Sequence, residues 1–221
     1  MAKGTLKNKT DELRRALTGY MNGHQHMMLK SMYSQYKNIQ QEIAVIEAEI
    51  DKRMEKDKEL IERLDEIPGV GKLTAQAIIA EIGTDMNQFP NEKHLAAWAG
   101  VCPGQNESAG KRKSGKTKKG NSNLKKTLVQ CANSASHSKG TYLSTQHKRI
   151  AHRRGRKKAN VAVAHTILII IYFMIATGAC YQDLGADYFD KRNKESVVKR
   201  SVRRLESLGF EVVIKPKDDA A

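Results

Sequence analysis

Two stretches of this sequence combine glycine and lysine in patterns that suit the binding of phosphate groups. In the first, residues 67–72 read IPGVGK. Pro68 ends a preceding helix, since its ring and missing N–H prevent continuation, and Gly69 and Gly71 bracket a tight turn. The next helix begins with backbone N–H groups and a positive dipole end that suit a phosphate oxygen, with Lys72 beside it. This order predicts a helix–hairpin–helix that contacts the DNA backbone without reading its sequence, and an ordinary helix turn is the alternative.

The second stretch, Gly110–Thr117, satisfies the Walker A pattern of phosphate-binding loops. That pattern is meaningful only between a buried strand and a helix, and the residues before it are broken by Gly100, Pro103 and Gly104. No acidic residue follows before Asp183, so a magnesium partner after an apolar strand is missing. The sequence therefore excludes a nucleoside-triphosphatase of this type.

The charge of the chain is concentrated in one segment. The 221 residues carry a formal charge of +15, yet no Asp or Glu lies between Ser108 and Gln182, where 16 of the 39 lysines and arginines are found. A solvated basic face would not require such a complete removal of acids, whereas a surface that binds polyphosphate would. We therefore expect a polyanionic partner. The candidate DNA-binding cations are Lys111, Arg112, Lys113, Lys116, Lys118, Lys119, Lys125, Lys126, Arg153, Arg154, Arg156, Lys157 and Lys158.

The elements that must position these residues are predicted to be mainly α-helical. Apolar residues spaced alternately three and four apart indicate one long helix, continuous or nearly so, from about His24 to Glu66. The narrow stripe suits an antiparallel hairpin or a coiled-coil homo-oligomer, and a helix packed on its own domain is the alternative. We assign residues 1–65 to this coiled-coil helix, which should stand away from the globular part. The stripe consists of Leu29, Met32, Tyr36, Ile39, Ile43, Ile46 and Ile50.

A second long helix is expected over Val161–Cys180, 20 residues without a charge. Its length and the basic residues before it fit a single membrane span. His165, Thr166 and Thr177 lie within it, however, and the other apolar faces need a partner, so we favour the buried central helix of a helical core. This interpretation predicts no contact with a membrane.

Other features limit the class of protein. Three widely spaced cysteines form neither a disulfide framework nor a zinc pattern, and no residues of this chain suggest a metal site. The polar, basic N-terminus contains no secretory signal, so we expect a cytoplasmic protein. Residues 66–214 are expected to form one helical domain that contains the helix–hairpin–helix, and residues 215–221 a disordered tail.

Four stretches together resemble a known family of transposases. They are residues 67–83 with the IPGVGK turn, residues 95–111 from LAAWAGVCP to SAGK, residues 118–126 (KKGNSNLKK), and residues 181–189 (YQDLGADYF) with the tail at 202–210. The chain resembles the C-terminal part of insertion-element transposases that pair an RNase H-like four-acid domain with a serine-bearing domain. That family includes pilin-type invertases and the bridge-RNA-guided recombinases.

The resemblance implies a function for particular residues. In the family, the serine five residues after the proline is the nucleophile, which corresponds to Ser108 here, whereas the sequence alone does not separate Ser108 from Ser114 and Ser122. It implies double-stranded DNA as partner, with a guide RNA in some members. It also implies that Mg²⁺ belongs to an acid domain preceding the coil, so we expect this chain to hold no cofactor and to be incomplete as a catalyst. A non-catalytic, architectural DNA-binding protein and a single-span membrane protein remain the alternatives.

Overall fold

The computed structural model describes residues 8–17, 19, 21–104 and 106–214. The chain divides into two compact units, residues 1–56 and residues 57–221. The described residues are mainly helical, as the sequence predicts, and their only sheet is a two-stranded one. The predicted disordered tail at residues 215–221 lies outside the described residues.

The first unit contains α1 (Thr10–Leu17) and the 31-residue α2 (Gly23–Arg53). α2 begins with a capping box, in which the Gln25 N–H donates to Asn22 Oδ1 at 2.8 Å and the Asn22 N–H donates to Gln25 Oε1 at 3.1 Å. No residue of α2 is buried. Its apolar stripe is largely open to solvent: from Leu29 to Ile46 the side chains are between 43% exposed at Ile43 and 59% exposed at Ile46, and Ile50 is half-buried. The predicted stripe therefore lies on one helix, and apart from Ile50 its side chains are exposed among the residues that the structure describes.

The predicted helix to Glu66 is interrupted. α2 ends at Arg53, a short 3-10 turn, η2, covers Glu55–Asp57, and α3 (Lys58–Asp65) follows. The interruption comes where Arg53 and Asp57 replace apolar residues in the stripe, just before the residues of α3 that pack into the core. The buried residues of α3, Leu60, Ile61 and Leu64, instead belong to the core of the second unit.

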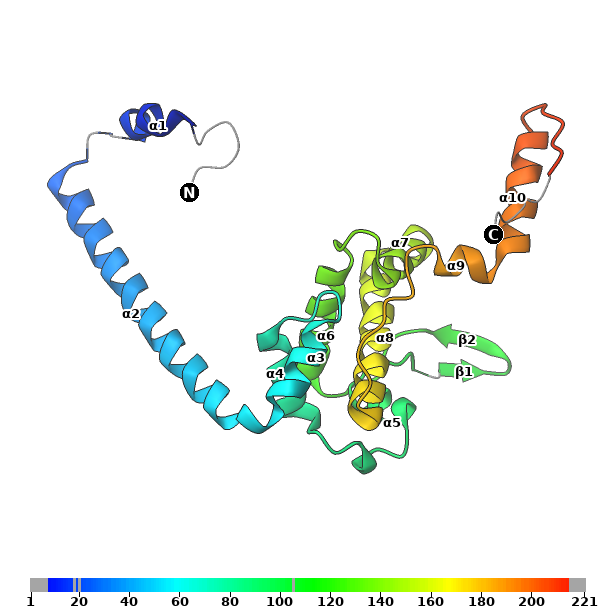
Figure 1. Cartoon of the computed structure of the whole chain (residues 1–221), viewed down its shortest axis with the longest axis horizontal. Coiled ribbons are helices and arrows are strands. Elements are labelled where there is room, and N and C mark those ends of the chain that lie inside the picture. The colour runs from blue at the N-terminus through cyan, green and yellow to red at the C-terminus, as the bar shows by residue number, and fades with distance from the viewer. Residues whose placement is uncertain (1–7, 18, 20, 105, 215–221) are drawn as a thin grey trace, which may run out of the picture. The chain divides into compact units, whose positions relative to one another are not determined.

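The second unit is a bundle of helices around α8 (Arg156–Thr177) (Figure 1). α8 contacts α3, α5, α6, α7 and η3. Its buried residues recur at helical spacing along the face turned to these neighbours: Ala159, Val163, Ala164, Ile167, Leu168, Ile171 and Met174. The other elements of this unit are α4 (Lys72–Ile82), η3 (Met86–Gln88), α5 (Glu92–Trp98), α6 (Ser122–Ala135), α7 (Tyr142–Arg154), α9 (Tyr188–Arg192) and α10 (Lys194–Glu206).

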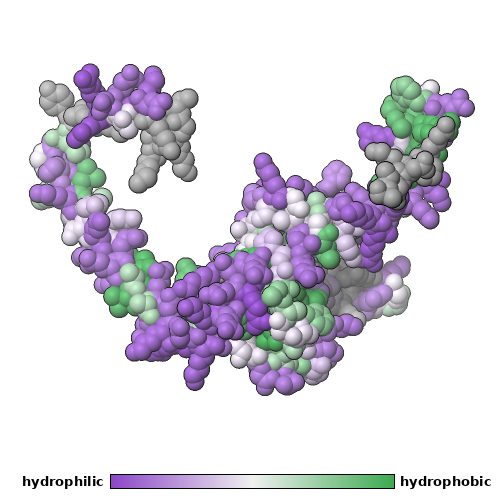
Figure 2. Space-filling view, in the orientation of Figure 1, coloured by the Kyte–Doolittle hydropathy of each residue, from purple (hydrophilic) through white to green (hydrophobic). Residues whose placement is uncertain are grey.

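Among the described residues, α8 is the one helix long and apolar enough to cross a membrane. It is also the element around which the second unit packs, and Arg63 of α3 donates to the carbonyl of Gly178 at its C-terminal end, at 2.5 Å. The surface of this unit is largely hydrophilic in the view of Figure 2. Its packing agrees with the predicted role of α8 as the central core helix.

Candidate nucleic-acid interface

The segment expected to be a basic loop folds as a β-hairpin. β1 (Asn106–Ser108) pairs antiparallel with β2 (Lys111–Ser114), and Ser108 lies opposite Lys111. Ala109 and Gly110 between them have φ of 51° and 71°. Positive φ at both central residues is the turn that matches the twist of two paired strands, and Gly110 supplies one of them without strain. Figure 1 shows the hairpin extending away from the helices.

Three glycines hold the base of the hairpin close to the helical body. The Gly104 N–H donates to the Lys116 carbonyl at 2.9 Å, and Pro103 forms a bridge with Thr117. A Cβ on Gly120 would lie 2.4 Å from the Gly100 nitrogen and 2.5 Å from the Trp98 oxygen. Side chains larger than hydrogen cannot be accommodated there, so Gly100, Gly104 and Gly120 allow the two arms of the hairpin to meet.

Asn121 joins the hairpin base to two helices. Its Oδ1 accepts from the N–H groups of Asn123 and Leu124 at 3.0 Å each, which caps the N-terminus of α6. Its Nδ2 donates to Glu81 Oε2 of α4 at 2.5 Å, and its own N–H donates to the Trp98 carbonyl at 3.0 Å. Sequence reasoning missed both Asn121 and Glu81, although Asn121 stands where a helix cap is expected.

The three candidate serines differ in their surroundings. Ser108 is exposed and ends β1, one residue before the hairpin turn. Ser114 is half-buried, and its Oγ accepts from the Lys116 N–H at 3.1 Å. Ser122 is exposed and is the first residue of α6. Ser108 is therefore the serine that the hairpin holds at its outer end.

The lysines near the hairpin are mostly free to meet a partner. Lys125 is the exception, because it is half-buried and its Nζ donates to Thr117 Oγ1 at 2.6 Å. Arg112 and Lys113 lie in β2 by their backbone. The remaining predicted cations of this region are exposed: Lys111, Lys116, Lys118, Lys119 and Lys126.

The IPGVGK turn joins α3 to α4 and packs on another helix. Ile67 and Val70 are buried, and Gly69 has a φ of 88°. A Cβ on Gly69 would lie 2.4 Å from the Cys131 oxygen of α6, which explains the glycine. Burial raises the pKa of the neighbouring Cys131 thiol, so this thiol is neutral.

The N-terminus of α4 faces solvent. The Gly71 N–H and carbonyl both bond Thr74 Oγ1, at 2.8 Å each, and no side chain caps the helix from outside. Gly71 and Lys72 are exposed. The positive end of the helix dipole is therefore accessible to an anion beside Lys72.

A third basic group lies where α7 meets α8. Gly155, with a φ of 85°, forms the corner between the two helices. It is flanked on both sides by cations with exposed side chains: Arg153, Arg154, Arg156, Lys157 and Lys158.

The predicted DNA-binding residues do not form one cluster. The hairpin base joins the N-terminus of α6 through Asn121, whereas Gly69 packs near its C-terminus, against Cys131 and Ala135. α6 has 14 residues, a length of about 20 Å at 1.5 Å per residue. The two predicted contact regions therefore pack toward opposite ends of α6.

The described residues do not fit a divalent metal ion. They include no group of three or more His, Cys, Asp or Glu side chains that could hold one. Glu107, beside Ser108, and Glu81 lie in different elements and have no acidic companion. We therefore assign no metal-dependent step to these residues.

Comparison with known proteins agrees with the expected family. Residues 61–148 match the Transposase IS116/IS110/IS902 family. Over 159 residues the chain is 31% identical to the transposase for insertion sequence element IS1111A of Coxiella burnetii (strain RSA 493 / Nine Mile phase I), which covers 70% of this chain and 43% of that protein. Over 106 residues it is 32% identical to the transposase for insertion sequence element IS1328 of Yersinia enterocolitica, which covers 48% of this chain and 31% of that protein.

The chain thus spans less than half the length of the curated relatives it matches. The family match contains the α3–α4 turn, the β1–β2 hairpin and all of α6. In these residues the chain is similar to the transposases of insertion-sequence elements.

Proposed function

We propose that this chain is the DNA-binding, serine-bearing part of an insertion-element transposase. The observation that carries the proposal is the basic β-hairpin, which holds Ser108 exposed next to Lys111 and is fixed at its base to α4, α5 and α6. The similarity to insertion-element transposases covers this hairpin.

In the proposed reaction, the Ser108 hydroxyl attacks a phosphorus atom of the DNA backbone. A bond forms between Ser108 Oγ and phosphorus, the bond from phosphorus to one sugar oxygen breaks, and that oxygen leaves as a hydroxyl after taking up a proton. The phosphoserine ester preserves the bond for later rejoining. Lysines of the hairpin stabilise the negative charge that develops on the phosphoryl oxygens.

A serine hydroxyl is a weak nucleophile at neutral pH and needs a base. Glu107 is adjacent in sequence, but neighbouring side chains in a strand point to opposite faces of the sheet. We therefore propose that activation of Ser108 comes from an acid-bearing domain outside the described residues. What this chain contributes is the binding of the duplex and the presentation of the serine.

The α3–α4 turn supplies a second proposed DNA contact. We interpret it as a helix–hairpin–helix, in which the exposed N-terminus of α4 at Gly71 and Lys72 contacts a phosphate. The contact involves only the sugar–phosphate backbone, so it adds affinity and orientation without sequence preference.

The exposed stripe of α2 is proposed to pair with a second copy of the chain in antiparallel orientation. With Leu29, Tyr36 and Ile43 at heptad position a, Glu42 occupies position g and Glu47 position e. In a parallel pair, Glu42 would face Glu47 of the partner subunit, which repels. An antiparallel pair brings g positions opposite g positions, so it removes the contact between Glu42 and Glu47 of the partner subunit.

Titration of binding against salt tests the DNA-binding part of the proposal. The triple variant Lys111→Gln, Lys116→Gln, Lys118→Gln removes three exposed cations of the hairpin region, and Lys30→Gln, Lys37→Gln, Lys52→Gln removes three exposed cations elsewhere as a charge-matched control. The slope of log K against log salt for a random duplex should fall by about 2–3 for the hairpin variant, at about 0.9 per phosphate contact. Equal losses in both variants, or salt-independent binding by the parent chain, would contradict it.

A further inference from the structure

The last helix, α10, gathers four of its cations on one face, while Lys194 and Glu195 lie toward the opposite side and Val197 lies beside Arg204. At about 100° per residue, Lys199, Arg200, Arg203 and Arg204 occupy one face of the helix, whereas Val198, Val202 and Leu205 occupy the opposite face. All four cations are exposed, and no residue of α10 is buried. In the part of the chain that the structure describes, none of the four forms an ion pair.

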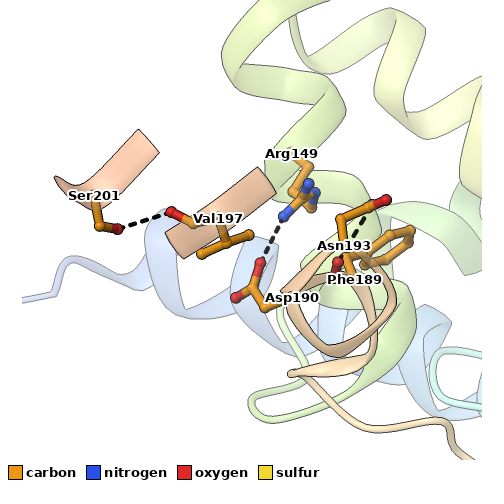
Figure 3. Close-up of polar contacts among 6 residues, drawn as sticks. All are labelled: Arg149, Phe189, Asp190, Asn193, Val197 and Ser201. Carbon is orange, nitrogen blue, oxygen red and sulfur yellow. Dashed lines mark hydrogen bonds and ion pairs between the residues drawn. The ribbon is translucent and has the colours of Figure 1, made fainter. Parts of the chain in front are cut away.

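The N-terminal end of α10 is attached to α7 through α9. Figure 3 shows Arg149 of α7 directed at Asp190 of α9, with 3.0 Å between Nη1 and Oδ1. The Arg149 guanidinium also lies 5.1 Å from the centre of the Phe189 ring. Tyr142 stacks on Phe189 with ring centres 5.1 Å apart and meets Tyr188 edge-on at 5.3 Å. These contacts hold α9 on α7.

The segment before α9 is held on the same helix. Asp183 Oδ1 accepts from the N–H of Tyr142, the first residue of α7, at 3.0 Å. The same oxygen accepts from the Gly185 N–H at 2.7 Å, and Tyr181 donates to Oδ2 at 2.8 Å. Because a carboxylate is favoured at a helix N-terminus, Asp183 fixes the path of the chain toward α9.

This attachment links α10 to the basic corner between α7 and α8. Arg153 lies four residues after Arg149, so both are on one face of α7. α10 follows α9 after the single residue Asn193, whose Nδ2 lies 3.5 Å from the Phe189 carbonyl. The face of α7 that holds α9 therefore continues into the cations around Gly155.

The density of charge on α10 matches that of duplex DNA. Lys199 and Arg204 are five residues apart, which is about 7.5 Å along the helix. Duplex DNA carries one negative charge per about 1.7 Å, or about four charges in that length. That count includes both strands, about two phosphates on each, so the four unpaired cations match the charge of both backbones over this length. A helix lying on a membrane would need a broader apolar face with bulky side chains, and three of the four apolar residues of α10 are valine.

We propose that α10 is a second DNA-binding arm, whose cationic face contacts the phosphates of duplex DNA in continuation of the α7–α8 corner. The inference rests on the proposed function, which supplies DNA as the partner. The ion pair between Asp190 and Arg149 attaches α9, and with it the start of α10, to α7. This attachment reduces the conformational entropy that α10 loses when it binds DNA.

The test is the binding of a random DNA duplex to the whole chain as a function of salt. The variant Lys199→Gln, Arg200→Gln, Arg203→Gln, Arg204→Gln neutralises the arm, and glutamine preserves helix propensity. Lys30→Gln, Lys37→Gln, Lys52→Gln, Lys56→Gln removes the same charge from exposed positions elsewhere. The arm variant should lose about 3–4 from the salt slope and at least about tenfold in affinity at 0.1 M salt, and the control variant should keep the parent slope.

Other outcomes overturn the proposal in distinguishable ways. If the arm variant binds DNA like the parent while Lys111→Gln, Lys116→Gln, Lys118→Gln loses affinity, the arm is not a DNA contact and the proposed function stands. If the parent chain does not bind duplex DNA, the proposed function fails and the arm proposal fails with it. Loss of binding to phosphatidylglycerol vesicles with unchanged binding to DNA would assign the arm to a lipid surface instead.

Discussion

Replacement of Asn121 by alanine should destabilise the second unit more than an ordinary surface change. The variant removes a helix cap, which contributes about 1 kcal/mol. It also removes the donor to Glu81, and a hydrogen bond to a charged group contributes about 1.5–3 kcal/mol, with the lower end appropriate because Glu81 is half-buried. We therefore expect Asn121→Ala to lower the free energy of unfolding by about 2–3 kcal/mol.

Urea denaturation followed by tryptophan fluorescence measures the lowered free energy of unfolding with a probe beside Asn121. Trp98 is the only tryptophan of the chain, and its carbonyl accepts the Asn121 N–H. The matched control is Asn193→Ala, because Asn193 also precedes a helix but makes no capping hydrogen bond there. That variant should change the free energy of unfolding by less than about 0.5 kcal/mol.

A double-mutant cycle separates the two roles of Asn121. Glu81→Ala removes only the second partner, so the coupling energy between Asn121→Ala and Glu81→Ala should be about 1.5 kcal/mol. Two losses that simply add would show that the contact between α4 and the hairpin base contributes nothing. A loss below about 0.5 kcal/mol for Asn121→Ala alone would refute the reasoning for the cap as well.

Three further changes probe the turn, the core and the exposed stripe. Gly69→Ala should lower the free energy of unfolding by at least about 2 kcal/mol, because its Cβ would lie 2.4 Å from a backbone oxygen of α6. Gly110→Ala, which has a similar φ but open space around it, should lower this free energy clearly less. Similar losses for the two variants in urea denaturation would contradict the packing argument. Burial lowers the pKa of His165 below 6.5, so the unfolded state binds protons first as the pH falls, and stability present above that pH should decline below it. His165→Gln should flatten this decline, and an unchanged pH profile would exclude His165 as its source. Ile43→Asp with Ile46→Asp should abolish self-association in sedimentation equilibrium, and a monomeric parent chain would contradict pairing through α2.

The elements with strong periodicity were the ones that sequence reasoning predicted well. α2 follows from an apolar repeat, α8 from a 20-residue run without charge, and the glycines of the α3–α4 turn from a motif whose residues have local conformational reasons. The helix was predicted to be continuous or nearly so to about Glu66, and the sequence did not locate its break after Arg53, because a polar interruption ends a helix only when no tertiary packing compensates.

The hairpin around Ser108 illustrates a different limit. Its strands consist of Asn, Glu, Ser, Lys and Arg residues, without the alternating β-branched or aromatic residues that usually predict strands. What fixes it is the turn at Gly110 and the close contact of Gly100 with Gly120 across 20 positions of the sequence. When two distant backbone segments pair closely, the sequence shows only isolated glycines, which do not by themselves predict a hairpin. Tertiary structure likewise decides that Lys125 of α6 is half-buried whereas Lys126 is exposed.

Identification of the residue that becomes joined to DNA tests the proposed chemistry most directly. The chain would be combined with the acid-bearing domain of a full-length relative, a DNA duplex carrying an insertion-element end and Mg²⁺, and the protein–DNA adduct would be digested and mapped by mass spectrometry. The account predicts a phosphodiester on Ser108, no adduct with Ser108→Ala, and an unchanged DNA affinity for that variant. An adduct on Ser114 or Ser122, or an adduct that survives Ser108→Ala, would contradict it.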